Sequence, residues 1–124
     1  MSVSSIKKSQ KESLIFKAIA QLFAQTTLDD TRLQTVTVNR VKLSDDKGVA
    51  SVYFYMPGGF AEFKEKLPII LLYKSSLRRA LARKINARYT PELIFKFDDQ
   101  YEKQQRIQGI LEKIKGEDSS SSSQ

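Results

Sequence analysis

A Val- and Thr-rich run and an alternating apolar run, joined by a short polar turn, constrain the fold of this chain more than any other feature. The runs span Leu33 to Leu43 and Val49 to Met56, and residues 44–48 between them read SDDKG. Apolar residues recur at every second position of the later run, as in a strand with one buried face. A five-residue turn between two strands predicts an antiparallel hairpin.

The alternation slips once inside the earlier run. Val36 and Val38 fall on one face of a strand, whereas Val41 and Leu43 fall on the other. A β-bulge would restore the pattern, and so would burial of both faces.

The segments before and after this hairpin have apolar residues at helical spacing. The predicted helices are Ser9–Thr27, Phe60–Tyr73, Ser75–Asn86 and Tyr101–Lys115, the last with Ile107, Ile110, Leu111 and Ile114 on one face. Ser9, with Glu12 three residues later, has the pattern of a capping box. Pro68 either begins a second helical segment or kinks the first.

Leu93 to Phe97 alternates again and predicts a third strand, which completes the order α-β-β-α-α-β-α. The third strand must pair with one of the first two after a helical crossover. We therefore predict an α+β fold in which helices pack on one face of a three-stranded sheet.

The chain has 124 residues, which is the size of one domain. Residues 116–124 read GEDSSSSSQ and contain no apolar side chain, so we expect a disordered Ser-rich tail after a single domain over 1–115.

The sequence contains no histidine and no cysteine. This excludes Ser–His–Asp triads, cysteine nucleophiles, zinc sites of the Cys/His type and disulfides. The acid pairs at Asp29/Asp30, Asp45/Asp46 and Asp98/Asp99 are typical of caps and turns. We predict no catalytic residues, no metal and no cofactor, although an enzyme that uses Asp, Glu, Lys, Arg, Tyr or Ser stays a remote alternative.

The longest uncharged run, Val49 to Ala61, is interrupted by a Pro-Gly-Gly sequence and is too short to span a bilayer. No signal-peptide pattern is visible. We therefore expect a soluble, cytoplasmic monomer with no membrane partner and no small-molecule substrate.

The charge balance indicates an anionic partner. The chain has 21 Lys+Arg against 14 Asp+Glu, a net charge of +7, and nucleic acid is the commonest partner of such a domain. The excess is concentrated between 74 and 88, where six basic residues occur without an acid. They are Lys74, Arg78, Arg79, Arg83, Lys84 and Arg88.

On a helix, Arg79 and Arg83 lie opposite the stripe of Leu77, Leu81 and Ile85, so the helix would bury its leucines and expose guanidinium groups. Guanidinium groups suit bidentate contacts with phosphate. The alternatives are a solvated basic face or neutralisation by Glu62 and Glu65.

Two weaker candidates for RNA contacts lie elsewhere. One is the N-terminal group Lys7, Lys8 and Lys11, and the other is the pair Arg40 and Lys42 on the first strand. Tyr53 and Tyr55 share a strand face, where they either stack on unpaired bases or simply cover the sheet. A protein-interaction module that grips an acidic partner is the second functional class that these charges allow.

The segment LRRALARKINARYTPELIFKFD, from Leu77 to Asp98, resembles the signature of the ribosome-binding factor A family. The matching features are Leu77-Arg78, the Arg88-x-x-Pro-Glu-Leu piece, Phe95 and Asp98. The resemblance extends from about Lys7 to Ile114.

This resemblance implies a type II KH-like fold, αββααβ with an additional C-terminal helix. It also implies a non-enzymatic factor that binds the 30S ribosomal subunit and 16S rRNA during late maturation and is linked to cold adaptation. The family's Ala-x-Gly kink between helices would fall on residues 73–75, where glycine is missing. We therefore expect Ser75 and Ser76 to form the kink.

Overall fold

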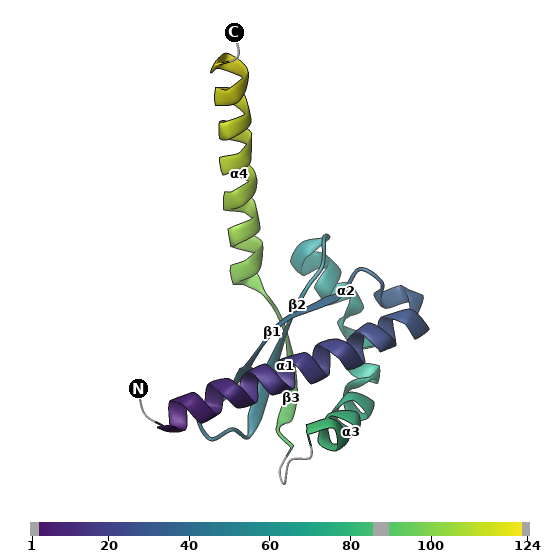
Figure 1. Ribbon diagram of the computed structural model, residues 1–124. Coiled ribbons are helices and arrows are strands. Elements are labelled where there is room, and N and C mark those ends of the chain that lie inside the picture. The colour runs from purple at the N-terminus through teal and green to yellow at the C-terminus, as the bar shows by residue number, and fades with distance from the viewer. Residues whose placement is uncertain (1–2, 86–89, 123–124) are drawn as a thin grey trace.

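The computed structural model describes residues 3–85 and 90–122, with side chains described for 7–85 and 90–114. The helices are α1 (Val3–Asp29), the 3-10 turn η1 (Thr31–Leu33), α2 (Gly59–Leu72), α3 (Lys74–Ile85) and α4 (Asp99–Ser122). The strands are β1 (Thr37–Leu43), β2 (Val49–Tyr55) and β3 (Glu92–Phe97). The predicted α+β order is confirmed (Figure 1).

The sheet has the order β1-β2-β3, in which β1 and β2 are antiparallel and β2 and β3 are parallel. The α2–α3 segment supplies the crossover that a parallel pair requires. Between Val38 and Arg40 the register of β1 shifts by one residue. A β-bulge, one of the two explanations that the sequence left open, is therefore present, and it places Asn39 outside the pairing.

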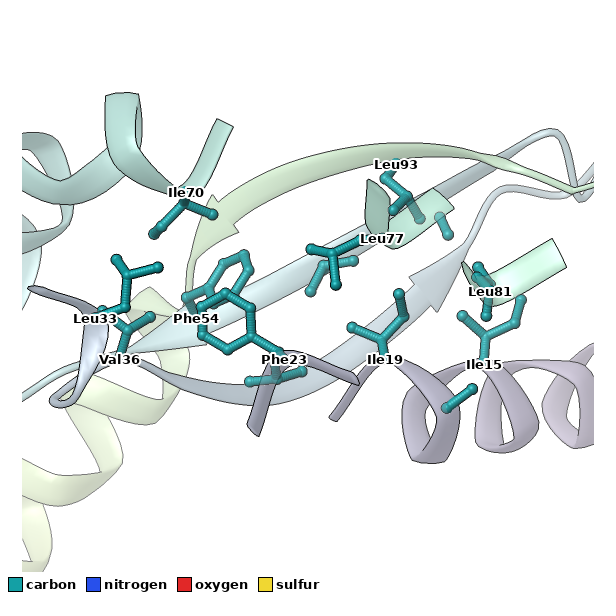
Figure 2. Packing of buried hydrophobic residues seen from close by; sticks show 14 of the residues in the cluster. Ile15, Ile19, Phe23, Leu33, Val36, Phe54, Ile70, Leu77, Leu81 and Leu93 are labelled. Carbon is teal, nitrogen blue, oxygen red and sulfur yellow. The ribbon is translucent and has the colours of Figure 1, made fainter. Parts of the chain in front are cut away.

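The hydrophobic core lies between one face of the sheet and the helices α1, α2 and α3 (Figure 2). Phe54 of β2 is fully buried and contacts Phe23 of α1 edge-on, with ring centroids 5.1 Å apart. In Figure 2, Leu77 of α3 lies near Ile19 and Leu81 near Ile15. Helices α1 and α3 therefore run antiparallel over the sheet.

Helix α1 is longer than predicted at both ends, and the predicted capping box is wrong. Ser9 lies inside α1, and the carboxylate of Glu12 accepts a hydrogen bond from the backbone N–H of Leu43 at 2.7 Å. Glu12 therefore accepts a hydrogen bond from a backbone N–H on the open edge of β1 and not from one at the start of its own helix.

The break between α2 and α3 falls at Tyr73 and not at Ser75 and Ser76, which lie in the first turn of α3. Tyr73 stays in the right-handed region at φ −96° and ψ −1°, so no glycine is needed. Pro68 lies inside α2 and does not begin a separate helix. The predicted end of α3 at Asn86 lies outside the described residues.

Helix α4 differs most from the prediction, because it projects away from the sheet (Figure 1). Ile107, Ile110, Leu111 and Ile114 are each 50–59% exposed, whereas we expected them to pack. The first three helices already cover the apolar sheet face, so this face is not available to α4. The helix also continues to Ser122, where we predicted a tail from Gly116, because extending an existing helix costs far less than starting one.

Candidate nucleic-acid interface

Helix α3 presents the basic face that its sequence predicts. Leu77 and Leu81 are buried, whereas Arg79, Arg83 and Lys84 are exposed. None of these three cations forms an ion pair within the part of the chain that the structure describes. Their charges are therefore available to a partner.

Glu62, one of the two acids that could have neutralised this face, is directed elsewhere. The other, Glu65, is exposed and forms no ion pair among the described residues. Glu62 pairs with Lys66 at 3.1 Å and accepts hydrogen bonds from the Thr35 hydroxyl and the Gly58 N–H. The Thr35 hydroxyl is the main cause of a Glu62 pKa below its usual value. Glu62 therefore supports its own helix and leaves the α3 arginines unpaired.

Two lysines of α1 extend this basic face. At 100° per residue, Lys7 and Lys11 fall on the flank of α1 that carries Ala18, whereas Lys84 falls on one flank of α3 and Arg79 and Arg83 lie opposite its buried leucines. The antiparallel packing of the two helices brings the N-terminal half of α1 beside the C-terminal half of α3. We call the resulting set the basic helical surface. It consists of Lys7, Lys11, Arg79, Arg83 and Lys84.

The other basic residues of the 74–88 segment have different positions. Arg78 donates from Nε to the Pro91 carbonyl at 3.2 Å and from Nη2 to the Thr90 carbonyl at 3.1 Å. Arg78 therefore holds the chain that enters β3, which is a structural role that the sequence did not indicate. Lys74 is half-buried and lies on the same flank of α3 as Arg78. Arg88 lies outside the described residues.

The predicted residues Lys8, Arg40 and Lys42 do not join the basic helical surface. Lys8 pairs with Asp45 in the hairpin turn at 3.0 Å. Arg40 and Lys42 lie on the sheet face that points away from α1. The structure thus divides the predicted contact residues between a helical side and a sheet side.

Asp98 holds Asn39 and Arg40 of β1 through its carboxylate. The sequence indicated a cap or turn residue and a member of the family signature, but not this contact. Asp98 is 1% exposed and accepts hydrogen bonds from Asn39 Nδ2 at 2.8 Å and Arg40 Nε at 2.9 Å. Its other oxygen accepts the backbone N–H of Tyr101 at 3.1 Å and so caps α4. Burial raises the pKa of Asp98, but these hydrogen bonds and the nearby guanidinium outweigh it, and the net pKa is lowered.

A second buried carboxylate, Asp30, binds Tyr73, the residue that separates α2 from α3. The Tyr73 hydroxyl donates to Asp30 Oδ2 at 2.6 Å, and Arg32 donates to both carboxylate oxygens at 2.9 and 2.7 Å. The Arg32 contact, followed by the Tyr73 contact, holds the pKa of Asp30 well below its usual range. This network fixes the residue at which α3 begins and therefore the direction of its arginines.

We expect stability to fall in acid, because Asp30, Asp98 and Glu62 all have lowered pKa values in the fold. A lowered folded-state pKa stabilises the fold above the unfolded value of about 4, and this contribution is lost as the pH falls through the folded value. Urea unfolding should thus give a constant free energy from about pH 6 to pH 8 and a steep decline below about pH 4. A flat profile down to about pH 3 would contradict these assignments.

Neither a metal centre nor a membrane span is found among the described residues. No group of three or more Asp and Glu side chains there could hold a metal ion. No described helix is both long enough and apolar enough to cross a bilayer.

The sequence and fold match one family throughout. Residues 7–111 match the family model described as ribosome-binding factor A. A relative of that name from Clostridium acetobutylicum is 34% identical over 102 residues, which are 82% of this chain and 84% of the relative. Another from Geotalea uraniireducens is 30% identical over 119 residues, which are 95% of this chain and 97% of the relative.

Solved structures give the same result. The crystal structure of ribosome-binding factor A from Thermus thermophilus has a TM-score of 0.60 and 34% identity, covering 71% of this chain and 92% of that one. A homology model of the Thermus thermophilus factor, fitted into the cryo-EM map of a complex of the 30S subunit with ribosome-binding factor A, has a TM-score of 0.50 and 32% identity, covering 71% of this chain and 87% of that one. The fold, the signature and these relatives together place the chain in the ribosome-binding factor A family.

Proposed function

We propose that this protein binds the small ribosomal subunit through 16S rRNA during late maturation of the particle, in the cytoplasm and without catalysing a reaction. The observation that carries the proposal is the basic helical surface, which presents five cations from two packed helices. Membership of the ribosome-binding factor A family supports the ribosome as the partner. The fit of the Thermus thermophilus homology model into the map of a 30S complex with ribosome-binding factor A supports the small subunit.

The interface would bind RNA through the positive charges of its side chains and through the fixed positions of these side chains on the helices. Leu77 and Leu81 fix α3 on the core, so its guanidinium groups are presented from a rigid helix with little additional ordering on binding. Arginine matches phosphate oxygens with two parallel donors. Phosphate contacts of this kind position a protein on folded RNA by the shape of its backbone.

A salt titration tests the electrostatic part of this proposal. Neutralisation of about five phosphates predicts a slope of about −4 when the logarithm of the affinity for small subunits is plotted against that of the salt concentration. Doubling the salt should then weaken binding roughly 16-fold. A slope near zero would show that this surface does not hold phosphates.

Crosslinking in cells, followed by sequencing of the attached RNA, tests the identity of the partner. We expect reads concentrated in small-subunit rRNA and in its incompletely processed precursors. Reads elsewhere would contradict the proposal. If an acidic protein is the partner instead, a pull-down will retain it after nuclease treatment.

A further inference from the structure

The outer face of the sheet forms a second surface with its own chemistry. Helices α1 and α3 pack against the inner face, where Ala50, Val52 and Phe54 are buried. At the Asp98 end of the outer face, Tyr101 of the first turn of α4 packs on Tyr55 with ring centroids 4.6 Å apart. Among the described helices, none packs on the remainder of this face.

Register aligns the outer side chains in two rows across the three strands. Arg40 of β1 is paired with Tyr53 of β2, and Tyr53 is paired with Lys96 of β3. The neighbouring row is Lys42, Ser51 and Ile94. Lys42 and Lys96 are exposed, and Ile94 is 40% exposed.

Arg40 and Tyr53 form a prebuilt stack in the centre of this face. The guanidinium carbon lies 4.1 Å from the centroid of the tyrosine ring, and Nε is held by Asp98 at 2.9 Å. The Arg40 side chain is still 39% exposed, so part of it can be reached from solvent while the guanidinium lies over the ring. The Lys96 amine lies 5.9 Å from the same ring.

We infer that this outer sheet face binds an unpaired RNA strand, in which a base stacks on the Arg40 guanidinium while Lys42 and Lys96 contact phosphates. Bases stack on guanidinium planes as well as on aromatic rings, but only an unpaired base can present its face. The cations of the two rows supply charge complementarity, and Ile94 supplies apolar contact. The Asp98 carboxylate that holds Arg40 is buried and does not reach the ligand.

This inference rests on the proposed RNA-binding function but uses a different surface. The basic helical surface and the outer sheet face lie on opposite sides of the sheet. The domain would thus contact a folded RNA element with its helices and an unpaired segment with its strands.

The test measures binding of the full chain to a fluorescein-labelled uridine decamer and to an RNA duplex of equal length. Lys42→Glu with Lys96→Glu should weaken decamer binding at least ~10-fold. Lys64→Glu with Lys103→Glu, which makes the same change of charge at exposed positions of α2 and α4, should weaken it less than ~3-fold. Arg40→Lys retains the charge but removes the stacking plane, and we expect a loss of at least ~5-fold.

The outcomes separate this inference from the proposed function. Arg79→Glu with Arg83→Glu should retain decamer binding within ~3-fold, since these residues lie on the helical side. The inference is overturned if the native chain does not bind the decamer, if it binds the duplex through Lys42 and Lys96 equally well, or if the Lys42/Lys96 variant matches its control. A variant that loses small-subunit binding but retains decamer binding would identify a contact of the basic helical surface and not of the outer sheet face. Should the glutamate variant unfold, Lys42→Gln with Lys96→Gln gives the same comparison.

Discussion

A chain that carries Arg79→Glu and Arg83→Glu should no longer co-sediment with small ribosomal subunits at physiological salt. Both side chains are exposed on α3 and form no ion pair among the described residues. The double change removes two cations from the basic helical surface and adds two anions, so attraction to phosphate becomes repulsion. We expect the affinity to fall on the order of 100-fold.

The fold should tolerate this change. Exposed substitutions away from caps and buried contacts usually alter stability by less than about 0.5 kcal/mol, as we expect at Arg79. Arg83 lies in the last turn of α3, where a glutamate opposes the helix dipole at a cost of about 0.3–1 kcal/mol. The matched control is Lys64→Glu with Lys103→Glu, which should sediment with the subunits nearly as the native chain does. Native-like sedimentation of the Arg79/Arg83 variant would remove these residues from the interface.

The fold was largely predictable because its elements follow local patterns. The two-residue period of β2 predicted the hairpin, and the slip in β1 marked the place of the bulge but left burial of both faces as an alternative. The four-residue spacing of Leu77 and Leu81 gave the buried stripe of α3. Helix ends were less predictable, because the partner of Glu12 is the backbone of Leu43, 31 residues further along the chain.

Helix α4 shows a different limit of periodicity. Its apolar stripe indicates which residues share a face but not whether another element is left to cover that face. The inner face of the sheet is already covered by α1, α2 and α3. An amphipathic pattern therefore predicted the helix correctly and its packing incorrectly.

The candidate site was likewise only partly predictable from the sequence. An acid-free run of basic residues is visible in the sequence, and it includes Arg79, Arg83 and Lys84, which the fold leaves exposed. The same run included Arg78, whose guanidinium binds carbonyls 12 and 13 residues later. Arg40 has its carboxylate partner 58 residues away. Charge in a sequence therefore indicates which residues are candidates, whereas the tertiary partners decide which of them face a ligand.

Asp98→Ala should destabilise the fold by about 2–4 kcal/mol. The change removes the cap of α4, a loss of about 1 kcal/mol, and it leaves the half-buried Asn39 amide without its acceptor. Arg40 adds little to this loss as an ion pair, because 39% of its side chain reaches solvent. Urea unfolding at neutral pH measures the difference.

The neighbouring Asp99→Ala is the matched control, because Asp99 is exposed and also lies in the first turn of α4. It loses only a favourable interaction with the helix dipole, about 0.3–1 kcal/mol. Asp98→Asn keeps a capping oxygen but loses the negative charge, so its stability should lie between those of the native chain and Asp98→Ala. Equal stability of the two alanine variants would mean that Asp98 does not join β1, β3 and α4. If Asp98 does join them, Asp98→Asn also loosens the hold on Arg40 and should weaken decamer binding while leaving small-subunit binding through α3 intact.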